Sequence, residues 1–135
     1  MKSSMKLWIV AILMVVSGSM WGAPPLASIQ RAKAIEEEAR WQLPMESGFG
    51  LTMTSVEFDS QSNTLEYIYY YSFPVDVPSP ESIQERRQAT IHLLKANPQS
   101  EDYQLCKSGI SYRYIYFSED GDYLFESSIS PDDLR

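Results

Sequence analysis

The sequence predicts a two-layer α+β domain, in which about four antiparallel strands form two hairpins and two main helices cover one face of the sheet. Two stretches indicate the strands at the centre, residues 64–73 and 110–117. Both are short, rich in tyrosine and β-branched residues, and alternate with the period of two that is typical of strands. A second strand-like segment and a helix-like segment accompany each of them. The expected order α-β-β-α-β-β favours one antiparallel sheet with its helices on one side.

The first 23 residues are predicted to be an export signal. Lys2 and Lys6 are the only charges in this segment, and an apolar run of ten, residues 7–16, is followed by small residues up to Ala23. Ten residues are too few to span a bilayer, but counting on to Ala23 gives seventeen, so an N-terminal anchor stays open as the alternative. We therefore expect an exported protein: periplasmic, anchored in the inner membrane with a periplasmic domain, or secreted. Residues 24–135 are expected to form its single domain.

The charge of that domain limits its partners. The chain has eleven Lys and Arg residues, and two of these lie in the predicted signal. The domain therefore has nine basic residues against eighteen Asp and Glu, which gives it a net charge of −9. This acidic domain has neither the basic patch that binds nucleic acid nor the polybasic cluster that binds anionic lipid. We expect no nucleic-acid partner, and contact with a membrane only through the N-terminal segment if it is not cleaved. A protein partner is compatible with the charge.

The first half of the domain begins with a helix at residues 26–41. Its apolar residues recur every three or four positions, and Pro44 ends it. Residues 46–50, ESGFG, are predicted to be a loop. They do not match a nucleotide-binding loop, because no strand precedes the glycines and no helix follows them. A strand at 51–58 and a turn at 59–63 lead into the first central strand.

The second half begins at Ser79 and Pro80, which are typical of a helix cap and first helical position. This helix is expected to end at Ala96, and a short turn or helix at 103–107 follows. After the second central strand, the Asp-Gly pair at 120–121 favours a hairpin into a last strand at 123–128. Residues 130–135 are predicted to be a polar tail.

The charged residues of the strands indicate which face of the sheet lies inside. Glu66, Arg113 and Glu126 alternate with Tyr67, Tyr112 and Phe125, and burying unpaired charge is costly, so the tyrosine-bearing face should meet the helices. The opposite face is rich in large apolar residues, and a contiguous apolar patch rimmed by charge is typical of a binding surface. The alternatives are that the signal region or a loop covers this face, or that the two faces are reversed. The predicted partner-binding residues are Glu66, Ile68, Tyr70, Arg113, Ile115, Phe117, Leu124 and Glu126.

Few residues are suited to catalysis or metal binding. His92 and Cys106 are the only histidine and cysteine, too few for a zinc site or an internal disulfide. Cys106 is interpreted as a small buried apolar residue, with a free or intermolecular thiol as the alternative. We expect no catalytic residues, no metal site and no cofactor.

Five short motifs lie in order along residues 43–130: Leu43-Pro44, the strand 52–56, Tyr67-Ile68-Tyr69, Cys106 before Gly109, and Tyr112-Arg113-Tyr114 with Asp120-Gly121. They resemble small exported bacterial proteins of unknown function, in which an LP and a T-x-L-x-x-V-like strand precede a Y-x-Y strand, and a cysteine precedes a second aromatic strand and a D-G turn. Members of that group often carry a second cysteine near the C-terminus, and this chain lacks it. The resemblance implies export and no particular activity.

The sequence thus predicts an exported, non-enzymatic domain that binds another protein through its sheet face. An inhibitor or immunity-type protein and an accessory of an envelope or secretion machine both fit this description. The alternative is a small-ligand binder or hydrolase with a site between the helices and the sheet. The oligomeric state stays open.

Overall fold

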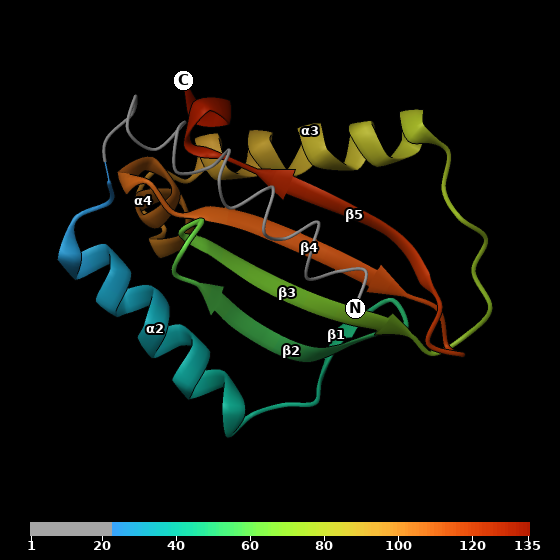
Figure 1. Ribbon diagram of the computed structural model, residues 1–135. Coiled ribbons are helices and arrows are strands. Elements are labelled where there is room, and N and C mark those ends of the chain that lie inside the picture. Colours follow the sequence, from blue (N-terminus) through green and yellow to red (C-terminus); the bar gives the residue numbers. More distant parts are fainter. Residues whose placement is uncertain (1–22) are drawn as a thin grey trace.

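The computed structural model describes residues 23–135, and the expected export signal lies outside this part of the chain apart from Ala23. In chain order the elements are α2 (Leu26–Arg40), β1 (Met45–Gly48), β2 (Leu51–Asp59), β3 (Thr64–Tyr71), α3 (Pro80–Ala96), α4 (Glu101–Ser108), β4 (Ser111–Phe117), β5 (Tyr123–Ile129) and the 3-10 helix η1 (Pro131–Leu134). The strands form one sheet in numerical order, with α2 beside one edge and α3 along the other (Figure 1). Within residues 23–135, no helix combines the length and the apolar character needed to cross a membrane.

The sheet has five strands and is mixed, so the expected four-stranded antiparallel sheet is wrong on both counts. The two predicted hairpins, β2–β3 and β4–β5, are antiparallel as expected. Between them, β3 and β4 run parallel, from Thr64 opposite Ser111 to Tyr70 opposite Phe117. The connection through α3 and α4 returns the chain to the end of the sheet at which β3 began, and such a crossover is what parallel neighbours require. Turn residues specify pairing within each hairpin, but no local signal specifies how the hairpins join.

The additional strand, β1, lies where the sequence predicts a loop. It pairs with β2 from Met45 opposite Met53 to Gly48 opposite Leu51. The turn between them, Phe49-Gly50, has positive φ at both residues, 53° and 72°. Two-residue hairpin turns of this kind usually carry Asn-Gly or Asp-Gly, and phenylalanine in the first position hides the signal.

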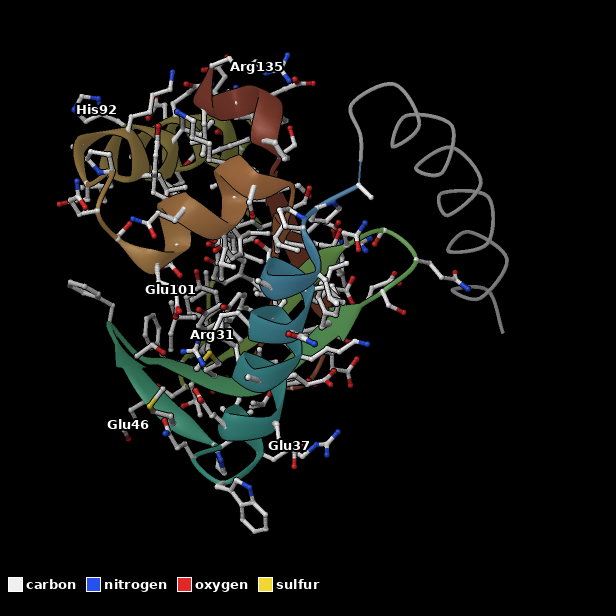
Figure 2. All side chains as sticks on the ribbon, turned by 90° about the vertical axis from the view of Figure 1, so that its left-hand side faces the viewer. Arg31, Glu37, Glu46, His92, Glu101 and Arg135 are labelled. Atoms are coloured by element: carbon white, nitrogen blue, oxygen red, sulfur yellow. The ribbon has the colours of Figure 1, made fainter. Side chains whose placement is uncertain are left out.

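The predicted main helices are confirmed, and a third is added. The hydroxyl of Ser79 accepts a hydrogen bond from the Ser82 amide at the start of α3. The short segment predicted at 103–107 is a helix of two turns, α4, in which Ser100 caps the Tyr103 amide. Arg31 of α2 donates to Glu101 at the start of α4, with 2.6 Å between Nε and Oε2, and Figure 2 shows the two side chains next to each other. The observed order, α-β-β-β-α-α-β-β, therefore replaces the expected one.

The C-terminal segment is ordered structure and not a polar tail. Ser130 and Asp133 cap each other in a capping box that begins η1. Asp133 also pairs with Arg87 of α3, with 2.6 Å between Oδ1 and Nη2, and Leu134 packs against the core. Proline and two aspartates in the first turn suit the start of a helix, a signal that the interpretation as a tail overlooked.

The core confirms the predicted inner face. Leu65, Tyr112 and Phe125 are buried on the side of the sheet that meets the helices, whereas Glu66 and Arg113 lie on the other side. All three helices contribute to the same core. Its buried residues are Ala32, Val56, Leu65, Ile91, Leu94, Leu105, Cys106, Ile110, Tyr112 and Ile129.

A charged side chain from a helix binds a backbone group of β2 and another binds one of β5. On the β2 side, the Phe58 amide donates to the Glu36 carboxylate of α2 at 2.9 Å. On the β5 side, Arg87 Nε of α3 donates to the Ser128 carbonyl at 2.8 Å. Unpaired strand edges invite pairing with other chains. These two contacts occupy single backbone groups of β2 and β5, whereas all four residues of β1, the edge strand next to β2, are exposed.

Candidate functional site

The strand register brings together seven of the eight residues predicted to bind a partner, and the eighth, Leu124, has no partner in the register because it lies where the β4–β5 ladder is irregular. They come from the three neighbouring strands β3, β4 and β5 and lie on the side of the sheet opposite the helices, which we call the outer face. Each is half-buried. The strand register places them in rows across the sheet: Glu66 beside Arg113, Ile68 beside Ile115 and Glu126, and Tyr70 beside Phe117.

The first row and Glu126 of the second row form a three-residue ion network. The Arg113 guanidinium lies between two carboxylates, 2.7 Å from Glu66 and 2.8 Å from Glu126. Burial alone would lower the pKa of Arg113, but hydrogen bonds and charge from the two glutamates raise it above its ordinary value. The network therefore joins β3, β4 and β5 by side-chain contacts at one end of the outer face.

Removing the central cation is expected to destabilise the domain. The Arg113→Met substitution leaves two half-buried carboxylates without their cation, and should lower the free energy of unfolding by about 1–3 kcal/mol in urea denaturation. Arg40→Met is the matched control, because its ion pair with Glu37 is more than half exposed on both sides and should contribute less than about 0.5 kcal/mol. Equal effects of the two substitutions would contradict the role of the network.

Apart from Glu126, the middle and far rows carry large apolar and aromatic side chains. Ile68 and Ile115 lie side by side at the centre. Beyond them the rings of Tyr70 and Phe117 stack with 5.1 Å between their centroids. The outer face therefore changes from charged at one end to aromatic at the other.

Tyr123 also belongs to the outer face, although strict alternation places it with Phe125 on the inner side. The ladder between β4 and β5 is irregular after Tyr116, so that Phe117 is opposite Tyr123. The Tyr123 ring meets Phe117 edge-on at 6.1 Å, and its hydroxyl donates to Glu126 at 3.0 Å. Burial and the Glu126 carboxylate raise the pKa of Tyr123. Bulges are frequent beside turns, but no residue here marks this one.

The inner face carries a second set of aromatic side chains. Tyr67 stacks on Tyr114 at 5.5 Å, and Tyr69 stacks on Tyr116 at 5.3 Å. These four rings are half-buried, and burial raises the pKa of each. Tyr112, the neighbouring inner-face tyrosine, is fully buried and donates its hydroxyl to the Asp102 carbonyl at 2.9 Å.

One cavity in the described part of the chain lies between α2 and the edge of β2. It measures about 370 Å³ and is lined by Glu36, Arg40, Leu43 and residues 54–58. This is the general place that the alternative function requires, between helix and sheet, but none of the inner-face tyrosines lines it. Glu36 is engaged with the Phe58 amide and Arg40 with Glu37.

The two residues with the greatest catalytic potential lie apart. His92 is exposed on the outer side of α3 (Figure 2). Cys106 is fully buried in α4, and burial, with smaller contributions from Asp133 and Asp102, raises the pKa of its thiol to about 12. The interpretation of Cys106 as a buried apolar residue is confirmed. Among residues 23–135, no three His, Cys, Asp or Glu side chains are placed to hold a metal ion.

Three solved structures share this fold. The type II secretion system pilotin AspS from Vibrio cholerae is 18% identical with a TM-score of 0.55, over 79% of this chain and 92% of that one. EpsS, the type II secretion pilotin from Vibrio vulnificus, is 16% identical with a TM-score of 0.52, over 82% and 90%. A candidate secreted protein from Pseudomonas aeruginosa is 12% identical with a TM-score of 0.53, over 84% and 100%.

At these identities the likeness establishes the fold and not the function. A search of curated proteins returned no match. A family model does match, from residue 28 to residue 125, and therefore includes β1 to β4 and the first three residues of β5. The chain belongs to the family described as "Domain of unknown function (DUF8479)".

Proposed function

We propose that this chain is an exported, periplasmic, non-enzymatic accessory of an envelope or secretion machine, and that it binds another protein through the outer face of its sheet. The observation that carries the proposal is the arrangement of that face. Ile68 and Ile115 occupy its centre, stacked aromatic rings lie at one end, and the Glu66–Arg113–Glu126 network lies at the other. An apolar centre with a charged rim is the usual anatomy of a protein interface.

The shared fold supports an accessory role, because two of the structures that share it are type II secretion pilotins. The residues themselves support a role without catalysis. The Cys106 thiol stays protonated and enclosed at neutral pH, and a buried thiol is a poor nucleophile. The acidic charge of the domain favours a neutral or basic partner surface and would speed the encounter with it.

The Ile115→Lys substitution tests the surface. The lysine stem can lie along the half-buried site while its ammonium reaches water, so the melting temperature should stay within about 5 °C of the wild type. Binding should weaken by at least about 30-fold, because a charge is placed at the centre of an apolar contact. The partner is first recovered from envelope extract with the exported protein and identified, and its dissociation constant is then measured with purified components.

Leu93→Lys is the matched control, because Leu93 is 62% exposed on α3 and lies outside the outer face. It should leave both stability and affinity unchanged. If Ile115→Lys unfolds the domain, the outer face is core and the proposal fails. If the variant folds and binds as tightly as the wild type, the partner uses another surface.

A further inference from the structure

The two long helices leave the middle of the inner face partly uncovered. The main contacts of α2 with the sheet are with β2 and those of α3 are with β5, at opposite sides of the sheet (Figure 1). The central strands β3 and β4 carry two stacked pairs of inner-face tyrosines, which we call the tyrosine strip: Tyr67 with Tyr114 and Tyr69 with Tyr116. Each of the four keeps part of its surface exposed. The tyrosine strip is therefore an aromatic surface that the described part of the fold does not fully cover.

The hydroxyl groups of the tyrosine strip have no hydrogen-bond partner within residues 23–135. The inner-face tyrosines on either side of the strip do have one. Tyr112 donates to the Asp102 carbonyl at 2.9 Å, and the Tyr71 hydroxyl accepts from Arg86 Nη1 at 3.4 Å. Covering a hydroxyl without giving it a partner costs free energy. A ligand that binds tightly to the strip must therefore offer hydrogen-bond acceptors.

A carboxylate stands at the α4 end of the strip. The Asp102 side chain forms no ion pair or hydrogen bond with another side chain in the described part of the protein. It is exposed, yet protein surrounds it sufficiently for burial to raise its pKa. After burial, its negative charge is the next cause of the raised pKa of Tyr67 and of Tyr69. The carboxylate is thus close to the strip and free to receive a cation.

A guanidinium group stands at the other end of the strip. Arg86 of α3 lies over the Phe125 ring, 5.5 Å from its centroid, and Phe125 is opposite Tyr116. Burial raises the pKa of Tyr116 to about 12, and the positive charge of Arg86 opposes this rise. Arg86 has no carboxylate partner among the described residues. Because Tyr112, next to Asp102, and Tyr116 are four residues apart on β4, the two charges are separated by roughly 13 Å.

These features distinguish between a helical and an extended ligand. A helix satisfies its own backbone groups, so it would cover the tyrosine hydroxyls without supplying acceptors. A polyproline II segment has free backbone carbonyls and docks on aromatic surfaces. It rises about 3.1 Å per residue, so two charged side chains four positions apart on such a segment match the distance between Asp102 and Arg86.

We propose that the tyrosine strip binds a proline-rich, extended segment of another protein, with a basic side chain at Asp102 and an acidic side chain at Arg86. The strip hydroxyls donate to the carbonyls of this segment. Like charges at the two ends disfavour the opposite orientation. The site lies on the other side of the sheet from the outer face, so it goes beyond the proposed function and does not depend on it.

A labelled peptide tests the charge at Asp102. The probe is the nine-residue peptide PPRPPPEPP and its reversal PPEPPPRPP, each carrying fluorescein, and anisotropy measures binding to the purified exported protein. One of the two orders should bind at least about tenfold more tightly than the other. Asp102→Asn should weaken that peptide about tenfold, and should have little effect on the same peptide with glutamine in place of its arginine. Asp120→Asn, which removes an exposed carboxylate from the β4–β5 turn, is the matched control and should bind like the wild type.

Tyr69→Phe tests the hydroxyls. It keeps the ring and removes the hydroxyl, so it should weaken the peptide about fivefold while the melting temperature stays within about 5 °C of the wild type. Tyr123→Phe makes the same change on the outer face and should leave peptide binding unchanged. If Tyr69→Phe binds as tightly as the wild type, the hydroxyls do not bond to the ligand and the argument for an extended segment fails.

The remaining outcomes separate this site from the proposed surface. Ile115→Lys should bind the peptide like the wild type, and a loss of peptide binding in this folded variant would place the peptide on the outer face. Failure of both peptide orders to bind at millimolar concentration overturns the site and leaves the outer face untouched. A helical peptide with arginine and glutamate nine positions apart is the last arm: tighter binding of this peptide, weakened by Asp102→Asn, would assign the strip to a helix and overturn the extended segment.

Discussion

Replacing Tyr112 by alanine is expected to lower the free energy of unfolding by about 3–5 kcal/mol. Tyr112 is 1% exposed at the point where the inner face of the sheet meets α4. Its ring lies 6.3 Å from those of Tyr67 and Tyr114, and its hydroxyl donates to the Asp102 carbonyl. The substitution therefore leaves a large cavity and removes a buried hydrogen bond at once. Urea denaturation measures the change, which approaches the whole stability of a marginal domain, about 5–15 kcal/mol.

Tyr112→Phe separates the two contributions. It keeps the ring and removes the hydroxyl, so it should lower the free energy of unfolding by about 1 kcal/mol. If Tyr112→Ala lowers it by no more than this, the ring is not packed in the core and the assignment of the inner face is wrong.

Alkaline pH is expected to unfold the domain cooperatively. Burial raises the pKa of five inner-face tyrosines above the usual value of about 10, and for Tyr116 the pKa rises to about 12. A group with a raised folded pKa stabilises the folded state fully below the unfolded pKa, and that contribution is lost as the pH rises toward the folded pKa. Between pH 10 and 12, Tyr116 favours the unfolded state by about 1.4 kcal/mol per pH unit, and the other four act in the same direction above pH 10. The five are Tyr67, Tyr69, Tyr112, Tyr114 and Tyr116.

Two signals followed during one titration measure this transition. The tyrosinate absorbance and the loss of far-ultraviolet circular dichroism should appear together, above pH 10. Tyr116→Phe is the matched variant: it keeps the ring stacked on Tyr69 but removes one ionisable group, so its midpoint should move to higher pH. Ionisation of all the tyrosines near pH 10 with the structure intact would show that the inner-face hydroxyls are open to water.

Much of the local structure could be predicted because single residues mark it. Ser79 and Pro80 mark the start of α3, and its end at Ala96 precedes Asn97 and Pro98. Both tyrosine-rich strands are where their alternation places them. The inner face was predictable because Glu66 and Arg113 lie on one side of the sheet, and packing that side against the helices would bury their charges in the core.

The features that escaped prediction depend on contacts between distant segments or on unusual residues at turns. No residue of Thr64–Tyr71 or Ser111–Phe117 signals that these strands pair in parallel. The turn at Phe49 lacks the usual asparagine, so β1 was not predicted. A bulge moves Tyr123 to the outer face, and bulges have no residue signature at this site.

The same limits apply to the candidate site. Alternation placed eight residues on one surface, and the strand register brings seven of them together on the outer face, whereas Leu124 has no register partner. Alternation could not identify Tyr123, because the irregular β4–β5 pairing brings this residue next to Phe117.

Solvent paramagnetic relaxation of the isoleucine methyl groups tests most directly whether the outer face is open. A soluble gadolinium chelate broadens methyl resonances in proportion to their exposure to solvent. An open outer face predicts strong broadening of Ile68 and Ile115, while Ile110 and Ile129, which are 0% and 1% exposed, stay sharp. If Ile68 and Ile115 are as well protected as Ile110 and Ile129, another part of the protein covers this face, and the proposed binding surface is contradicted.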